Sequence, residues 1–382
     1  MKKKILYIVG GLCQGGGERQ LCELISHLDR RLYDPVLLIY TNERKIFYKE
    51  IFESCPNVIA CGATDHSDLT GAALAFKWTT KTILDERPDI VHSFMHFGNF
   101  FARAASLISP KTPVITTIFG NFDLVHSPLF RKAELILGGR NTFVTVDLPE
   151  SKKQLARTGR VRPEKIIFIP TALDASRFES LREKTAAKNK LGLPEESFVV
   201  SCVARYSPVK NQLCTLRAAR ELKRLGRHES FRFIFAGDTG DTTYHNTLTS
   251  FVMEEHIEDI VNIGPVVEDV GAIFAASDFS VLSSHSEGIP NVLLESFACG
   301  APVVISSTAN SAGLVESGKT GFVFKDDDHL ELAEKLLTCA NLGDAERRNM
   351  SDECKRKVVN EFSWSEIIKK YQELYEIALS GR

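Results

Sequence analysis

The chain has 382 residues, of which 43% are hydrophobic and 25% are charged. This length predicts about two domains, and the composition excludes a disordered, collagen-like or disulfide-dominated protein. The 47 Lys and Arg nearly balance the 49 Asp and Glu, giving a formal net charge of −2, so we expect no nucleic-acid partner.

The first residues predict neither a secretory leader nor a membrane anchor. The apolar run from Ile5 to Val9 stops at Gly10, whereas a signal peptide needs about 7 to 15 apolar residues. No stretch approaches the roughly 18 apolar residues of a membrane span. The nine Cys are odd in number and lack zinc-ligand spacing. We therefore expect a cytoplasmic protein with reduced thiols and no bound metal, one that meets a membrane only peripherally, on the inner face.

In the front half, short apolar runs alternate with helical patterns, which is typical of parallel strands joined by crossover helices. The segment Glu18 to Asp29 is predicted to be helical, because its Leu and Ile residues share one face. The strands expected here are Ile5 to Val9, Pro35 to Tyr40, Asp89 to Phe94, Pro113 to Ile118, Phe143 to Val146 and Ile166 to Pro170.

The back half repeats this alternation after a polar, charged stretch, and we expect the linker to lie between Thr171 and Glu196. The last predicted helix, Ser363 to Leu379, carries an apolar stripe and must dock on another part of the protein. We predict domains at residues 1–175 and 176–362, followed by a helical segment at 363–382. The strands expected here are Phe198 to Ala204, Phe231 to Gly237, Val261 to Gly264, Phe279 to Ser284 and Pro302 to Ser306.

The stretch from Ser283 to Gly300 predicts a strand end, a short loop and a helix. Its helix begins near Pro290 and ends at Gly300. Free N–H groups at the start of a helix suit a phosphate. Glu287 and Glu295 would bring two carboxylates to the same pocket, where they would accept hydrogen bonds from hydroxyls of a sugar and a ribose. The alternative is that this spacing of two Glu residues arises by chance. The residues expected at the phosphate are Gly288, Ile289, Pro290, Asn291 and Val292.

Two cations, Arg205 and Lys210, follow the first strand of the back half. This is the ligand side of a parallel sheet. Fixed cations there would neutralise a departing diphosphate in place of a divalent metal. Solvated loop charges are the alternative.

The front half has a glycine-rich loop, Gly10 to Gly17, between its first strand and first helix. Glycines there let N–H groups approach an anion. The loop matches neither a Walker A motif nor a dinucleotide fingerprint, and a plain turn is the alternative. Farther along, His92, His96 and Asn99 lie around a strand end. We predict that they contact an acceptor and that His96 carries a proton; structural histidines are the alternative.

A basic segment runs from Arg131 to Lys165, with nine Lys or Arg against four acids. Contact with an anionic membrane and an ordinary solvated surface explain this segment equally well. Its members include Lys152, Lys153, Arg157, Arg160 and Arg162.

Together these motifs resemble the retaining glycosyltransferases of family 4. Such enzymes have the GT-B fold, an α/β architecture of two Rossmann-like β/α/β domains facing each other across a cleft. The resemblance spans nearly the whole chain, and it implies that the last helix crosses back onto the front domain. The site residues it implies are Arg205 and Lys210 for the donor diphosphate, Glu295 for the ribose, Glu287 for the transferred sugar, and Gly16 with Gly17 closing over the phosphates.

The implied reaction moves a hexose or N-acetylhexosamine from a nucleotide diphosphosugar, expected to be a UDP-sugar, to a hydroxyl of a glycan or lipid-linked glycan. The anomeric configuration is retained, no cofactor or metal is needed, and the product belongs to cell-surface polysaccharide synthesis. Two alternative interpretations are a UDP-sugar 2-epimerase with the same fold and a non-catalytic nucleotide-sugar binder. The residues predicted to be catalytic are Glu287, His96, Lys210 and Arg205.

Three positions depart from the family pattern. Phe119 stands where many members have His, Thr171-Ala172 replaces Asn-Gly, and Ala309 to Gly313 replaces a Gly-Gly-x-x-Glu turn. These departures affect the acceptor contacts and part of the donor pocket, and leave the diphosphate cluster unchanged.

Overall fold

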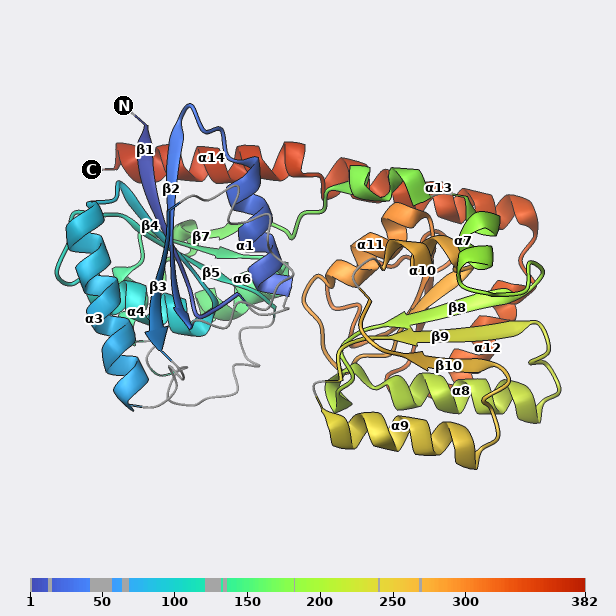
Figure 1. Cartoon of the computed structure of the whole chain (residues 1–382). Coiled ribbons are helices and arrows are strands. Elements are labelled where there is room, and N and C mark those ends of the chain that lie inside the picture. The colour runs from blue at the N-terminus through green and yellow to red at the C-terminus, as the bar shows by residue number, and fades with distance from the viewer. Residues whose placement is uncertain are drawn as a thin grey trace. The chain divides into compact units, whose positions relative to one another are not determined.

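The computed structural model describes residues 2–12, 16–41, 57–63, 69–120, 132, 136–181, 183–239, 241–267 and 270–381. The chain divides into two compact units (Figure 1). Unit 1 combines Met1–Ala172 with Trp364–Arg382, and unit 2 is Leu173–Ser363. Unit 1 is therefore built from two segments that lie far apart in the sequence.

Unit 1 contains a seven-stranded sheet in the order β3-β2-β1-β4-β5-β6-β7. All neighbouring strands are parallel, so their carboxyl ends share one edge. The order reverses direction between β1 and β4, which makes this pair the topological switch point. The strands are β1 (Lys3–Val9), β2 (Tyr33–Thr41), β3 (Asn57–Ala63), β4 (Ile90–Phe94), β5 (Val114–Ile118), β6 (Phe143–Val146) and β7 (Ile166–Phe168).

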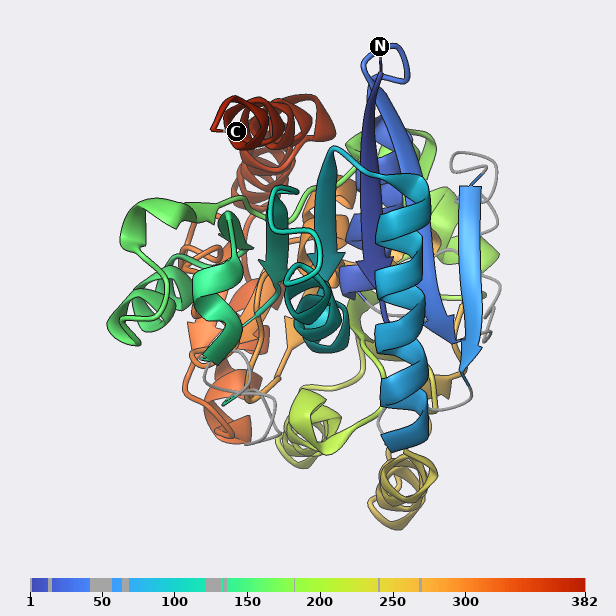
Figure 2. The same cartoon turned by 90° about the vertical axis from the view of Figure 1, so that its left-hand side faces the viewer.

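Helices cover both faces of this sheet, with α3 and α4 on one face and α1 and α14 on the other (Figures 1 and 2). Alternate side chains of β1 explain the two layers, since successive residues of a strand point to opposite faces. Ile5 and Tyr7 pack with α1 and α14, whereas Leu6 and Ile8 pack with α3 and α4. The helices are α1 (Gly16–His27), α3 (Leu69–Glu86), α4 (Met95–Ala105), α6 (Pro149–Arg157) and α14 (Trp364–Ser380).

The last helix, α14, docks on unit 1 as its apolar stripe requires. The OH of Tyr375 lies 3.0 Å from the OH of Tyr7 on β1, and Trp364 Nε1 donates to Glu23 Oε2 on α1 at 2.6 Å. The buried stripe comprises Trp364, Ile367, Tyr371, Leu374, Tyr375 and Ala378.

Unit 2 contains a six-stranded parallel sheet in the order β10-β9-β8-β11-β12-β13. Its order reverses direction between β8 and β11. The two units are thus Rossmann-like domains, in agreement with the α/β fold expected from the sequence. The strands are β8 (Phe198–Val203), β9 (Phe231–Ala236), β10 (Val261–Gly264), β11 (Phe279–Leu282), β12 (Val303–Ser306) and β13 (Gly321–Phe324).

The sheet of unit 2 also lies between two layers of helices. Helices α8, α9 and α12 pack on one face around Val200, Cys202 and Phe233. Helices α7, α10 and α11 contribute to the smaller clusters on the other face. The helices are α7 (Lys184–Lys190), α8 (Gln212–Arg224), α9 (Thr242–Glu254), α10 (Gly271–Ala276), α11 (Asn291–Cys299), α12 (His329–Ala340) and α13 (Asp344–Glu361).

The boundary between the two units, at Ala172 and Leu173, falls between Thr171 and Glu196, where the linker is expected. The rest of this stretch, including α7, belongs to unit 2. Ala187 of α7 packs against Ala275 and Ala276. Lys188 Nζ donates to the carbonyls of Glu195 and Ser197 at 2.8 and 2.7 Å. The charged composition of this helix reflects its exposed side, while Ala187 and the anchored ammonium hold the other side to the domain.

Candidate functional site

The switch point of unit 2 brings together the two back-half motifs. Arg205 and Lys210 follow β8, and Glu287 follows β11, the strand paired directly with β8. Loops that leave two adjacent parallel strands in opposite directions open a crevice between them, which is where ligands bind in sheets of this kind.

Lys210 and Glu287, 77 residues apart in the sequence, form an ion pair at this point. Lys210 Nζ lies 2.6 Å from Oε1 and 2.8 Å from Oε2 of Glu287. Ser284 Oγ also donates to Glu287 Oε1, at 2.6 Å. The Glu287 side chain is 8% exposed and that of Lys210 is 24% exposed. The carboxylate is therefore held from two sides, while the ammonium retains access to solvent.

The loop that carries Lys210 is fixed to the end of β11. Lys210 ends the short 3₁₀ helix Pro208–Lys210, and Asn211 follows in the left-handed conformation, with φ 48° and ψ 42°. Ser283 Oγ donates to the carbonyls of Lys210 and Asn211, at 3.2 and 2.8 Å. His285 N donates to the carbonyl of Val209 at 2.9 Å. These bonds set the Lys210 backbone beside the strand that leads to Glu287.

Arg205 lies at the same edge with an exposed side chain. The loop that begins with it packs tightly on the end of β9, because a Cβ at Gly237 would lie 1.9 Å from the carbonyl oxygen of Ala204. Tyr206 N donates to the carbonyl of Asp238 at 2.9 Å. Glycine at position 237 is thus required for the close approach of the β8 and β9 loops.

Helix α11 begins and ends as its sequence predicts. Pro290 is its N-cap, and Gly300 is its C-cap with φ 79°, a conformation that favours glycine. Gly288 and Ile289 precede the N-terminal turn in the loop after β11, and their contact with a phosphate stays a prediction. Glu295 is only 2% exposed, so it lies on the buried side of α11 rather than on an open surface.

The switch point of unit 1 carries the glycine turn. Gly16 and Gly17 begin α1 after β1, and a Cβ at Gly17 would lie 2.7 Å from Met95 Sδ and 3.0 Å from Phe119 Cδ2. Met95 follows β4 and Phe119 follows β5. The first turn of α1 therefore packs at the carboxyl edge of the unit 1 sheet, beside the residue that replaces the family's His.

The prediction that His92 and Asn99 contact an acceptor needs correction. Both residues are 0% exposed. His92 Nδ1 lies 2.8 Å from the OH of Tyr375, and His92 Nε2 lies 2.8 Å from Thr117 Oγ1. Asn99 Nδ2 donates to the carbonyl of Thr117 at 2.8 Å. Burial lowers the pKa of His92 to about 3, so this imidazole is a neutral part of the core.

His96 differs from His92, because it lies in the first turn of α4 and is partly exposed. It is the one of the two predicted histidines that reaches the surface at the carboxyl edge. Sequence reasoning missed Ser283 and Ser284, which hold Lys210 and Glu287 in place. His285 Nδ1 and the Asp326 carboxylate oxygens, 3.2 Å away, form a separate pair at the same edge. Serines are common after strands, so only the fold identifies their partners.

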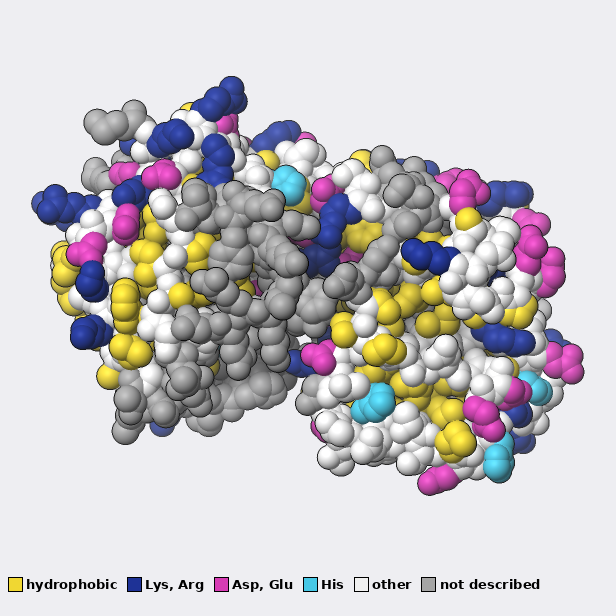
Figure 3. Space-filling model, in the orientation of Figure 1, with side chains coloured by type: hydrophobic (Ala, Val, Ile, Leu, Met, Phe, Trp, Pro, Cys, Tyr) yellow, Lys and Arg dark blue, Asp and Glu magenta, His cyan; other side chains and the backbone are white. Residues whose placement is uncertain are grey.

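No cluster of three or more His, Cys, Asp or Glu suited to a metal occurs among the residues with described positions. Within the same ranges, no helix is both long and apolar enough to cross a membrane. On the visible surface of each unit, Lys and Arg are interspersed with Asp and Glu (Figure 3), as the balanced composition predicts.

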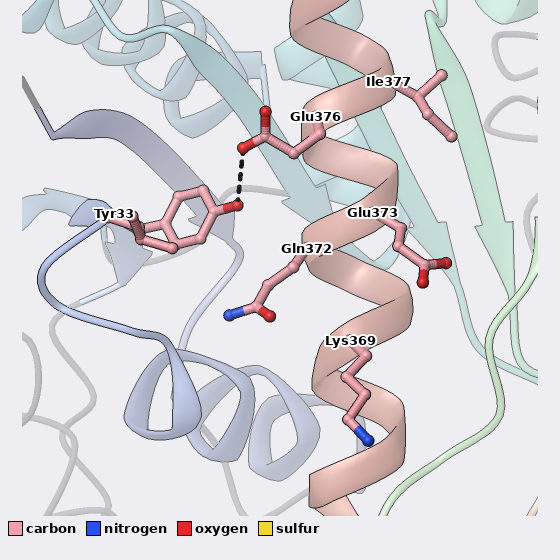
Figure 4. A pocket seen from close by; sticks show the side chains of 7 residues that line it. Tyr33, Lys369, Gln372, Glu373, Glu376 and Ile377 are labelled. Atoms are coloured by element: carbon pink, nitrogen blue, oxygen red, sulfur yellow. Dashed lines mark hydrogen bonds between the residues drawn. The ribbon is translucent and has the colours of Figure 1, made fainter.

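A pocket lies between α14 and the start of β2 (Figure 4). The OH of Tyr33 donates to Glu376 Oε1 at 3.3 Å there. Tyr33 begins β2, so this pocket is at the amino edge of the sheet, opposite the edge where parallel sheets bind ligands. We assign it no role.

Two family models match consecutive parts of the chain. The model described as Glycosyltransferase Family 4 matches residues 14–177. The model described as Glycosyl transferases group 1 matches residues 183–357, which include Arg205, Lys210 and Glu287.

Curated relatives are similar over different shares of the chain. The UDP-Gal:alpha-D-GlcNAc-diphosphoundecaprenol alpha-1,3-galactosyltransferase of Escherichia coli is 26% identical over 304 residues, covering 77% of this chain and 77% of that protein. The D-inositol 3-phosphate glycosyltransferase of Kineococcus radiotolerans is 26% identical over 234 residues, covering 58% of this chain and 53% of that protein.

Solved structures share the fold across the full chain. A glycosyltransferase from Rickettsia africae has a TM-score of 0.84 at 19% identity, with all of both chains covered. Anabaena Alr3699/HepE in complex with UDP and glucose has a TM-score of 0.84 at 20% identity, covering 98% of this chain and 99% of that one. The two sheets, these GT-B neighbours and the two family matches lead to one assignment: the chain belongs to the glycosyltransferases, with a Family 4 front domain and a group 1 back domain.

Proposed function

We propose that this glycosyltransferase transfers a hexose or N-acetylhexosamine from a nucleotide diphosphosugar to a hydroxyl of a glycan or lipid-linked glycan, with retention of configuration. The main support for the proposal is the ion pair between Lys210 and Glu287 at the switch point of unit 2. A cation for a diphosphate and a carboxylate for sugar hydroxyls then lie side by side where a parallel sheet binds ligands.

In the proposed reaction, the bond from the sugar's anomeric carbon to the diphosphate breaks, and the acceptor oxygen bonds to the same face of that carbon. The departing phosphate takes the acceptor's proton. Arg205 and Lys210 stabilise the charge that develops on the diphosphate, Glu287 orients the sugar, and His96 contacts the acceptor. The work of the protein is electrostatic stabilisation and positioning, and it calls for no metal.

UDP is the proposed carrier. The relative from Escherichia coli is named for UDP-Gal and a diphosphoundecaprenol acceptor, and the Anabaena protein was solved with UDP-glucose. These names favour a UDP-sugar as donor and a lipid-linked glycan as acceptor, in the synthesis of a surface polysaccharide.

A lipid-linked acceptor would bring the chain to the inner face of a membrane. The surface around α6 fits this partner, because Arg157, Arg160 and Arg162 are exposed there. Neighbouring acids neutralise part of the charge, since Glu150 and Glu164 pair with Lys153 and Arg162 at 3.2 and 3.4 Å. Contact of this surface with anionic lipid is part of the proposal.

Single substitutions at the ion pair test the proposed function. With UDP-, GDP- and ADP-sugars offered in EDTA, we expect the wild type to transfer sugar from one of them. Lys210→Ala and Glu287→Ala should each lower kcat/KM by at least about 100-fold, as the loss of a group that stabilises the transition state does. Arg224→Ala, which removes an exposed side chain on α8, is the control that should retain activity. Full activity in Lys210→Ala and Glu287→Ala, or transfer only with added metal, would contradict the proposal.

A further inference from the structure

Lys210 and Glu287 are assigned different partners in the proposed reaction, yet they bind each other. The ammonium lies within hydrogen-bond distance of both carboxylate oxygens, which occupies two of its three N–H groups. A diphosphate that approaches Lys210 must therefore compete with Glu287. In the same way, a sugar hydroxyl that approaches Glu287 meets a carboxylate already bonded to a cation.

The surroundings decide which partner moves. The backbone of Lys210 is fixed by Ser283 Oγ and by the bond from His285 N to the Val209 carbonyl. Asn211 Nδ2 adds a bond to Asp327 Oδ1 at 3.0 Å. Rearrangement is thus confined to the flexible side chain of Lys210, which is three times as exposed as that of Glu287, at 24% against 8%.

Glu287 keeps a partner when Lys210 leaves. Ser284 Oγ donates to its Oε1 at 2.6 Å, and Ser284 lies two residues after the end of β11. The carboxylate therefore stays oriented, and Oε2 becomes available to a hydroxyl donor. A carboxylate with one fixed bond and one available oxygen suits the recognition of a sugar hydroxyl.

We propose that Lys210 is a donor-operated latch on Glu287: the diphosphate draws the ammonium away from the carboxylate, and this exchange makes Glu287 available to the transferred sugar. The inference rests on the proposed function. It makes the sugar contact conditional on diphosphate binding, and it means that Glu287 weakens the binding of any nucleoside diphosphate.

Isothermal titration with UDP, GDP and ADP tests the latch in the full-length protein. Glu287→Gln keeps the shape but removes the charge, so it should bind the preferred nucleoside diphosphate about tenfold more tightly than the wild type, or ~1.4 kcal/mol. Asp326→Asn is the matched control. It removes one negative charge from the same sheet edge, but Asp326 pairs with His285 and not with Lys210. The affinity of Asp326→Asn for the same nucleoside diphosphate should stay within about threefold of the wild type, because a solvent-accessible ion pair contributes little energy.

The outcomes separate the latch from the proposed function. If a nucleotide binds the wild type and Glu287→Gln binds it equally or more weakly, or if Asp326→Asn gains as much, the latch is wrong and the function stands. If no nucleotide binds either the wild type or Glu287→Gln, both are wrong. Should Glu287→Gln fail to fold, Glu287→Asp retracts the carboxylate from Lys210 by one methylene and should show a gain in the same direction.

Discussion

At the scale of single residues, burial distinguishes the roles of two histidines that the sequence alone does not distinguish. His92 and His96 are four residues apart around the end of β4, but only His92 lies beneath α14, where the OH of Tyr375 and Thr117 Oγ1 occupy its ring nitrogens. The partner Tyr375 comes 283 positions later in the chain. A contact of that separation depends on tertiary structure, and no local pattern predicts it.

The stability of unit 1 should fall in acid because of His92. Its folded-state pKa of about 3 lies below the roughly 6.5 of an unfolded His. Between these values the unfolded chain binds a proton that the folded chain does not, so the free energy of unfolding falls as pH falls, by up to ~1.4 kcal/mol per pH unit. Tyr375 and Tyr371 stay neutral throughout, because burial raises the pKa of both.

Tryptophan fluorescence measures this effect, since the two Trp residues, Trp78 and Trp364, both lie in unit 1. Urea unfolding at pH 7.5, 6 and 5 should show the wild type losing stability relative to His92→Gln, which cannot titrate. Parallel pH profiles of the two proteins would mean that His92 takes up its proton in the folded state.

At the scale of elements, the strands missed by sequence reasoning are both at sheet edges. β3 and β13 are outermost in their sheets. Val58 and Ile59 on β3 and Phe322 and Val323 on β13 are only partly buried. Continuous apolar runs predict the other strands, because such runs arise when both faces of a strand are covered. An edge strand needs no such run. The loops after β8 and β11 were predicted because their charged residues follow recognisable central strands.

The junction between the β8 and β9 loops should be sensitive to a single methyl group. In Gly237→Ala the new Cβ meets backbone, the Ala204 carbonyl oxygen at 1.9 Å, so the loop that leads to Arg205 must shift. We expect a loss of about 1 to 3 kcal/mol in the stability of unit 2 and weaker nucleotide binding.

Gly264→Ala is the matched control at the end of the next strand. Its Cβ would meet only the Phe235 carbonyl oxygen, at 3.3 Å, so its stability loss should be clearly smaller. Circular dichroism follows both units, while tryptophan fluorescence follows unit 1 alone and should be unchanged in both variants. Equal melting temperatures for Gly237→Ala and Gly264→Ala would show that the loop after β8 can shift without a loss of stability.

At the scale of the whole molecule, the two units differ in how the chain builds them. Unit 2 is one continuous segment, Leu173–Ser363, whereas unit 1 is completed by Trp364–Arg382. Without α14, the polar groups of His92 and Tyr7 lose their buried partner and an apolar face of the sheet is uncovered. Each large side chain of the α14 stripe contributes about 1.5 to 3 kcal/mol by burial, so the helix supplies much of the stability of unit 1.

Separate fragments should therefore behave differently. Residues 173–363 expressed alone should unfold cooperatively by circular dichroism. Residues 1–172 alone should show no cooperative transition, and addition of a peptide of residues 364–382 should restore one. The tryptophan fluorescence of the mixture should then differ from the sum of the fragment and the peptide measured separately. A peptide with Tyr375→Phe keeps the apolar stripe but lacks the OH that meets His92 and Tyr7, and should restore less stability, by about 1 to 3 kcal/mol. If residues 1–172 melt at the temperature of the full chain without any peptide, α14 is an accessory to the front domain and not part of its core.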